Sequence, residues 1–168
     1  MVKHAAEFVT TGGYHWLFYQ GCPYHHEFDH TIKVEDDKKQ NKCGIGLVRW
    51  SINRLVGLEP IETETTGTVT TYPFQLQGEC VSLNMDVESG GFAQVEVLDE
   101  TGNVIHGYGL RDAVRIHMGD YTDLRPKWVN TNCVALLLDS VIRLRFSLNK
   151  SRLWSFQVVN RFVPVLYP

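Results

Sequence analysis

The segment CPYHHEFDHT, residues 22–31, holds the densest group of chemically active side chains in this sequence. One thiol, three histidines and two carboxylates fall within nine residues. Imidazole and carboxylate groups bind zinc or copper well, so His26, Asp29 and His30 are candidate ligands of a divalent metal. Two other interpretations stay open: a loop that contacts a ligand without metal, or a polar loop whose histidines only titrate near neutral pH.

Aromatic side chains suggest a second kind of binding site, because an aromatic ring packs well on the apolar face of a sugar. Tyr14 and Trp16 share one face of a predicted edge strand, where we expect them to be exposed. Tyr24 and Tyr121 lie in predicted loops and are further candidate contacts. The alternative role for such side chains is packing in the core, where large aromatic residues dominate the energetics.

Two further patterns bear on function. Asp112, Asp120 and Asp123 surround Gly119, and calcium in β-sandwich modules is held by oxygen ligands of this kind. Asn149-Lys150-Ser151 is an N-glycosylation sequon, with Asn149 as the acceptor. The sequence shows no nucleophile elbow, no HExxH, no glycine-rich phosphate loop and no CxxC, so we assign no catalytic residue.

The elements that position these residues follow a period of two. Apolar and polar residues alternate strictly in VSLNMDV (81–87), and AQVEVLD (93–99) and IRLRFSL (142–148) repeat the pattern, which indicates strands with one buried face. Segments 15–21 and 68–74 are further strand candidates, and a hairpin is expected around the Asn149-Lys150-Ser151 turn. Apart from one short helical turn in CVALLLDSVI, no window shows a helical period. We therefore predict an antiparallel, jelly-roll-like β-sandwich of about eight strands.

Composition limits the classes of partner. The chain of 168 residues fits one domain, with 43% hydrophobic and 21% charged residues. A net charge of −3, without basic runs interleaved with aromatics, argues against nucleic acid. No apolar run reaches the roughly 20 residues that span a bilayer. The N-terminal segment lacks the apolar centre of a signal peptide, which fits either a cytosolic protein or a mature or truncated form.

From Tyr14 onward, a series of short motifs occurs in a characteristic order. They include GIGLVRWSINRLVGLEP (44–60), TYPF (71–74), VEVLD (95–99), RLRF (143–146) and LWSF (153–156). In this order they resemble the end of five-bladed β-propeller glycoside hydrolases of the family 32 and 43 type, where the last propeller strands lead into a β-sandwich. The resemblance implies one domain over 1–168, with a propeller-remnant strand pair and loop at 14–50 and a sandwich core at 51–160. It also implies core positions for Trp128, Trp154 and Phe156.

The resemblance has consequences for activity and for individual residues. The catalytic carboxylates of such enzymes lie in earlier blades, and glycoside hydrolysis needs two facing carboxyl groups, so no enzymatic activity is expected here. A loop histidine near the sugar pocket of those enzymes corresponds to His25 or His26. If strands 14–21 and 43–50 pair antiparallel, Cys22 and Cys43 close the loop between them as a disulfide worth roughly 3 kcal/mol. Two reduced cysteines are the alternative, typical of a cytosolic protein.

These observations lead to three hypotheses on function. The first is a non-catalytic, lectin-like protein that binds glycans, with extracellular location favoured by the cysteine pair and the sequon. The second is a structural or self-assembling protein in which the same aromatics form subunit contacts. The third is a fragment of a larger glycoside hydrolase. Apolar surface left uncovered without the other blades favours a homo-oligomer.

Overall fold

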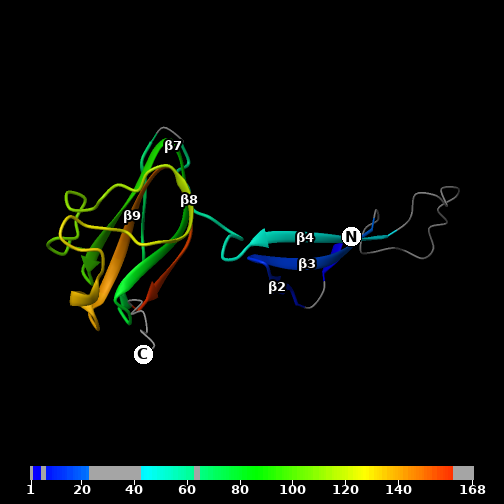
Figure 1. Ribbon diagram of the computed structural model, residues 1–168, viewed down its shortest axis with the longest axis horizontal. Helices are drawn as coiled ribbons and strands as arrows, with labels where there is room; N and C mark the ends of the chain where they lie inside the picture. The colour runs from blue at the N-terminus through cyan, green and yellow to red at the C-terminus, as the bar shows by residue number, and fades with distance from the viewer. Residues whose placement is uncertain (1, 5–6, 23–42, 63–64, 161–168) are drawn as a thin grey trace, which may run out of the picture. The chain divides into compact units, whose positions relative to one another are not determined.

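The chain folds as an all-β protein, as the alternating pattern predicted (Figure 1). The computed structural model describes residues 2–4, 7–22, 43–62 and 65–160. Within these ranges nine strands form two antiparallel sheets, and the one helix is the single turn η1, Ala135–Leu137, far too short to cross a membrane. The chain divides into two compact units, Met1–Leu55 and Val56–Pro168.

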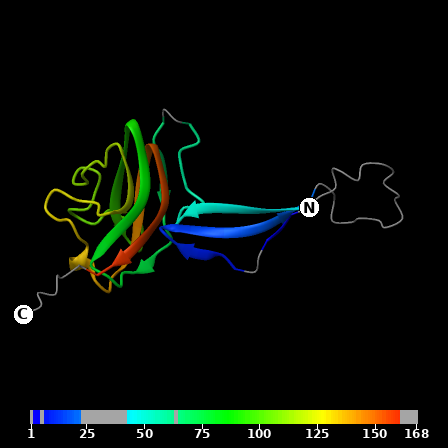
Figure 2. The same ribbon diagram turned by 45° about the vertical axis from the view of Figure 1, so that its right-hand side comes forward.

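The first unit is a four-stranded sheet built around one central strand. Its strands are β1 (Val2–His4), β2 (Val9–Thr11), β3 (Tyr14–Gly21) and β4 (Gly44–Ser51). β3 pairs with β1 and β2 on one side and with β4 along its whole length on the other (Figure 2). The predicted antiparallel pairing of 14–21 with 43–50 is therefore confirmed, but β3 is not an edge strand.

A disulfide joins the ends of β3 and β4. Gly21 and Gly44 are the last paired residues of the two strands, and Cys22 and Cys43 follow directly outside them. Their Cα atoms lie 4.3 Å apart, and the two sulfur atoms are bonded. The predicted disulfide is confirmed, and Cys80 and Cys133 take no part in a disulfide.

The second unit contains a five-stranded antiparallel sheet with two unusually long strands. Its strands are β5 (Gly67–Thr70), β6 (Phe74–Gln75), β7 (Cys80–Asp99), β8 (Gly119–Leu124) and β9 (Val141–Val159). β7 and β9 pair with each other, β8 lies on the outer edge of β7, and β5 and β6 pair with β9. The predicted strand 68–74 is divided because Pro73 cannot donate a ladder hydrogen bond.

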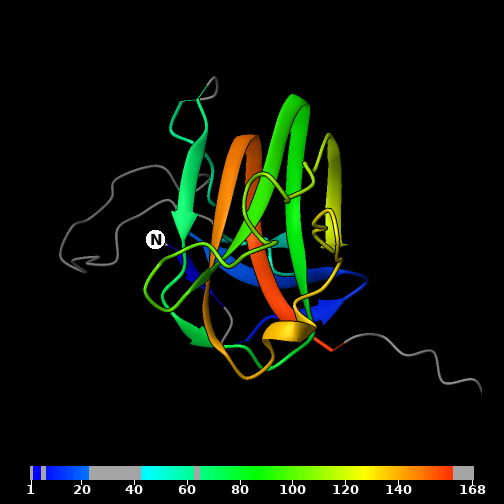
Figure 3. The ribbon, with the colours of Figure 1, turned by 90° about the vertical axis from the view of Figure 1, so that its left-hand side faces the viewer.

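Both long strands bend over near their midpoints, which produces the two layers of a β-sandwich (Figure 3). In one layer residues 80–87 pair with 151–159, and in the other 92–99 pair with 142–149. The segments on either side of Asn149-Lys150-Ser151 therefore pair with β7 and not with each other. The predicted hairpin is wrong, because the chain turns from one layer into the other at this point.

One hydrophobic core lies between the layers. The alternating apolar residues of both halves face inward, as predicted, and they form one cluster: Val81, Leu83, Met85, Val87, Ala93, Val95, Val97, Ile142, Leu144, Phe146 and Leu148. Phe146 of one layer contacts Phe156 of the other, with ring centroids 5.5 Å apart. Trp128 is buried against Tyr108, and its Nε1 donates a hydrogen bond to the Val95 carbonyl at 2.9 Å. The core positions of Trp128 and of the partly buried Phe156 agree with the sequence-based expectation.

Candidate functional site

Tyr14 and Trp16 form an aromatic pair on one face of the first sheet. They are separated by one residue on β3, so alternation places their side chains on the same face. Their ring centroids lie 6.1 Å apart in an edge-to-face arrangement, and Trp16 Nε1 donates a hydrogen bond to the Thr11 carbonyl at 3.2 Å. Both side chains are half-buried, because strands flank β3 on both sides. The sequence predicted the shared face but not this partial cover.

Arg49 completes this cluster from the neighbouring strand. It stands directly opposite Trp16 in the β3–β4 register. Its guanidinium carbon lies 4.6 Å from the Tyr14 ring centroid and 5.3 Å from the Trp16 ring centroid. Both distances are within the range of cation–π attraction. Sequence reasoning missed Arg49, since only the strand register shows that it faces the aromatic pair.

The same face continues as an exposed apolar surface. Phe18 follows Trp16 on β3 and pairs with Leu47 of β4, and they are 53% and 48% exposed. Ile45, two residues from Leu47, is 83% exposed. A row of rings therefore runs along β3 beside an arginine, with apolar side chains accessible next to it. We call Tyr14, Trp16, Phe18 and Arg49 the aromatic face.

The opposite face of the sheet carries a second aromatic group. His15 and Trp50 are directly opposite each other in the register, with ring centroids 5.6 Å apart. The exposed Phe8 contacts both rings, at 4.6 Å from His15 and 5.8 Å from Trp50. The Thr10 hydroxyl lies 2.7 Å from His15 Nδ1, which orients the imidazole. Packing of these rings on each other accounts for this group, so we assign it a structural role.

Tyr121 belongs to the second unit and not to the aromatic face. It lies on β8, and its ring folds back over Gly119, where an added Cβ would collide with it. Its hydroxyl donates toward the carbonyls of His117 and Met118, at 3.2 and 3.3 Å. Those contacts hold the Tyr121 side chain against its own strand end.

The acidic residues around Gly119 do not gather into a metal site. Asp123 accepts hydrogen bonds from the hydroxyl of Ser82 and from Arg125 Nε, the latter at 3.1 Å. These two bonds, the Ser82 bond foremost, lower the pKa of the Asp123 carboxyl. Across residues 2–4, 7–22, 43–62 and 65–160, no three His, Cys, Asp or Glu side chains are arranged to hold a metal ion. The proposed calcium ligands are thus not brought together.

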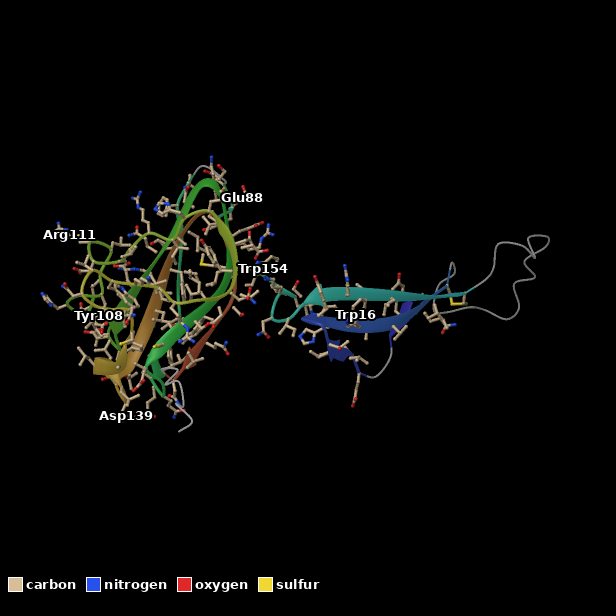
Figure 4. All side chains as sticks on the ribbon, in the orientation of Figure 1. Trp16, Glu88, Tyr108, Arg111, Asp139 and Trp154 are labelled. Carbon is tan, nitrogen blue, oxygen red and sulfur yellow. A yellow bond between two sulfur atoms is a disulfide. The ribbon has the colours of Figure 1, made fainter. Side chains whose placement is uncertain are left out.

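Trp154 lies outside the core cluster, contrary to the prediction. The β7–β9 register pairs Asn84 with Ser155 and Met85 with Leu153, so Trp154 is the additional residue of a β-bulge. Its ring is half-buried, and its Nε1 donates a 2.5 Å hydrogen bond to Asp86 Oδ1. Figure 4 shows Trp154 and the core residue Tyr108 at opposite sides of this unit.

Trp154 contacts a charged group on the surface of the second unit. The Arg152 guanidinium carbon lies 5.0 Å from the Trp154 ring centroid, and Arg152 Nε donates to Glu59 Oε2 at 2.6 Å. The Glu59 hydrogen bond raises the pKa of Arg152. These charges satisfy one another, so the group fits a role in attaching the segment around Glu59 to β9.

The remaining candidates from the sequence are Tyr24, His25, His26, Asp29 and His30, which lie outside the described residues. Asn149, the proposed glycosylation site, is half-buried at the bend of β9, where its side-chain amide donates to the Thr65 carbonyl at 3.2 Å. Ser151 of the same sequon is buried and donates to the Phe92 carbonyl. The sequon thus lies at the turn between the two layers.

Comparisons of the chain with models of protein families, with curated proteins and with solved structures find no match. Support for the candidate site therefore comes from its geometry. The aromatic face combines rings, accessible apolar surface and one guanidinium, without a nucleophile, a paired carboxylate or a described metal cluster. Such an arrangement can bind a ligand by stacking and hydrogen bonding.

Proposed function

We propose that the protein is a non-catalytic carbohydrate-binding protein that uses the aromatic face of its first unit. The observation that carries this proposal is the clustering of Tyr14, Trp16 and Arg49 beside the exposed ring of Phe18. Aromatic rings bury apolar C–H surface at little cost in conformational entropy, and the guanidinium supplies hydrogen-bond donors in a rigid fork. A sugar offers both an apolar face and a periphery of hydroxyl groups.

Three further features support this proposal. The resemblance of the sequence motifs to glycoside hydrolases supports a relation to proteins that bind sugars. The disulfide between Cys22 and Cys43 is typical of oxidising compartments, which supports an extracellular location for the proposed function. The sequon at Asn149 is a sequence motif that glycosylation in the same location would use.

The experiment is a glycan-array screen of the purified chain, followed by titration calorimetry on the glycans that bind. Trp16→Ala removes the central ring of the aromatic face and should weaken binding by up to about tenfold, given roughly 0.5–1.5 kcal/mol for an aromatic contact. Tyr72→Ala is the matched control, because Tyr72 is 90% exposed and belongs to the other unit. Equal binding by the wild-type protein and Trp16→Ala would place the sugar elsewhere, and no binding to any glycan would overturn the proposal.

The same screen run with EDTA tests the metal proposal for His26, Asp29 and His30. Binding that EDTA abolishes would assign a metal to the interaction, since chelation removes a divalent ion from imidazole and carboxylate ligands. Glycan binding that persists in EDTA would support the aromatic face as the binding site. Tyr24, His25 and Tyr121 are further substitution targets for a binding defect.

A second function, self-association, is favoured by the outer edge of β4. The Ile52 N–H donates a hydrogen bond to the Gly13 carbonyl at 3.2 Å, which continues the β3–β4 ladder. In an antiparallel ladder every second residue bonds to the partner strand, so the even-numbered residues of β4 bond to β3. Ile45, Leu47 and Arg49 then direct their backbone groups to the outer edge, with which no described strand pairs. An eight-residue edge with exposed apolar side chains favours pairing with another strand, here the β4 of a second copy.

Light scattering after size exclusion tests this homo-oligomer. A dimer that Leu47→Lys converts into a monomer would support pairing through β4, because charged residues on an edge strand disfavour association. The control is Val104→Lys, which adds the same charge to an exposed residue of the second unit. A monomer at all concentrations would rule out this second function and leave carbohydrate binding unaffected.

A further inference from the structure

Arg49 is held differently from the three arginines that pair with a carboxylate. Arg145, Arg152 and Arg125 each donate to a carboxylate, namely Glu96, Glu59 and Asp123. Arg49 instead lies against the rings of Tyr14 and Trp16 and, among the described residues, makes no hydrogen bond or ion pair. It is also exposed. Its N–H donors are therefore held near two aromatic rings without a described acceptor.

An exposed guanidinium without a described acceptor favours anionic ligands. Its planar fork matches a carboxylate or a sulfate with two parallel hydrogen bonds, which are roughly twice as strong as bonds between neutral groups. Contact with the two rings restricts the side chain before a ligand arrives, which lowers the entropic cost of binding. The charge around it is also favourable, since Glu7 is the one carboxylate among the described residues of Met1–Leu55.

The neighbouring surface limits the rest of the ligand. Phe18 and Leu47 continue the same face of the sheet and are about half exposed, so an apolar ring face can lie beside Arg49. A simple inorganic anion would use Arg49 alone and leave these side chains uncovered. A ligand that contacts both Arg49 and these apolar side chains must combine an anionic group with a ring that has an apolar face.

We infer that the aromatic face selects acidic saccharides, whose carboxylate or sulfate group binds Arg49 while the sugar ring lies on the neighbouring apolar surface. This inference rests on the proposed carbohydrate-binding function and adds the class of sugar. It predicts that removing the charge of the sugar, with its ring unchanged, removes most of the affinity.

The test uses the full chain and oligogalacturonate as the carboxylate probe, with its methyl ester as a neutral ligand of the same ring. A sulfated oligosaccharide and inorganic sulfate distinguish the source of the anion. The wild-type protein should bind the free acid about tenfold more tightly than the ester, as a charge-assisted hydrogen bond implies. This preference should decline as the salt concentration rises. Tighter binding of the sulfated oligosaccharide would assign sulfate as the preferred anion, and inorganic sulfate alone should bind weakly.

Substitutions of Arg49 test whether this residue causes the preference for the acid over the ester. Arg49→Gln should bind acid and ester alike, whereas Arg49→Lys should keep part of the preference, because it retains the charge but not the planar fork. Arg115→Gln is the matched control, since Arg115 is an exposed guanidinium 4.3 Å from the Phe92 ring centroid in the other unit. It should leave the preference unchanged.

Three outcomes would overturn the inference. Equal binding of acid and ester by the wild-type protein would remove the acidic preference while carbohydrate binding itself stands. An acidic preference that survives in Arg49→Gln would place the anion at another residue. No binding of any saccharide would end both this inference and the proposed function.

Discussion

Glu96 and Arg145 face each other directly across β7 and β9 and form a two-pronged ion pair. Arg145 Nε donates to Glu96 Oε2 at 2.6 Å, and Nη2 donates to Oε1 at 2.9 Å. The Glu96 side chain is 3% exposed and that of Arg145 is 33% exposed. The hydrogen bonds to Glu96 raise the pKa of Arg145, so the arginine is charged throughout the ordinary pH range. The pair joins the two longest strands next to the core.

Removal of the arginine should be costly because it leaves a buried carboxylate without its partner. We expect Arg145→Met to lower the free energy of unfolding by about 2 kcal/mol, less than for a fully buried pair because Arg145 is partly exposed. Urea denaturation with an unchanged m-value is the measurement. The double variant Glu96→Leu/Arg145→Met should recover most of the loss, since it no longer buries a lone charge. A double variant less stable than the single one would contradict this account.

Two adjacent glycines at the bend of β7 should differ in their tolerance of a side chain. At Gly91 a Cβ would lie 2.6 Å from the Asn149 carbonyl oxygen in the neighbouring bend of β9. At Gly90 nothing lies within 4 Å, and only the left-handed φ of +77° opposes a side chain. We expect losses of about 3 kcal/mol for Gly91→Ala and about 1 kcal/mol for Gly90→Ala in urea denaturation. The reverse order would show that the two bends do not pack as described.

The disulfide should stabilise the first unit selectively. Cys22 and Cys43 are separated by 21 positions, and closing a loop of this length restricts the unfolded chain by about 3 kcal/mol. In Cys22→Ser/Cys43→Ser, hydrogen exchange of β3 and β4 should accelerate strongly, while that of β7 and β9 should stay as in the wild-type protein. Reducing agent should reproduce this result in the wild type and add nothing in the variant. Equal loss of protection in both units would refute the selectivity.

Asp99 should make stability depend on pH in the acid range. Its pKa is lowered from 3.8 to about 2, first by the hydrogen bond from the Thr101 hydroxyl and then by the Asn103 backbone N–H. Because the folded-state pKa lies below the unfolded one, the ionised group stabilises the fold above pH 3.8, and this contribution is lost as the pH falls toward 2.

The variant Asp99→Asn keeps an oxygen acceptor without the charge. The difference in unfolding free energy between wild type and Asp99→Asn should be largest above pH 3.8 and shrink steadily between pH 3.8 and 2. Urea denaturation at a series of pH values measures it. Glu100→Gln, at the neighbouring exposed position, controls for the loss of one negative charge. A difference that does not change with pH would mean that the turn does not favour the ionised carboxyl.

Much of the candidate site could be predicted from local pattern. Alternation on β3 placed Tyr14 and Trp16 on one face, and the resemblance placed Cys22 next to Cys43. Arg49 could not be found in this way, because its position opposite Trp16 depends on the register between two strands that residues 22–43 separate in the chain. A shift of one residue would have turned Arg49 to the other face.

The sequence by itself determined the class of fold and the inward residues of each strand, because a strand's alternation is a local property. Only the tertiary structure decided that the segments around Asn149 pair with β7 instead of with each other, and that Trp154 leaves the core at a bulge. These outcomes depend on hydrogen bonds between residues far apart in the chain, for which the pattern within one strand carries no information. The choice of partner strand is set by packing of the whole core, to which both layers of β7 and β9 contribute side chains.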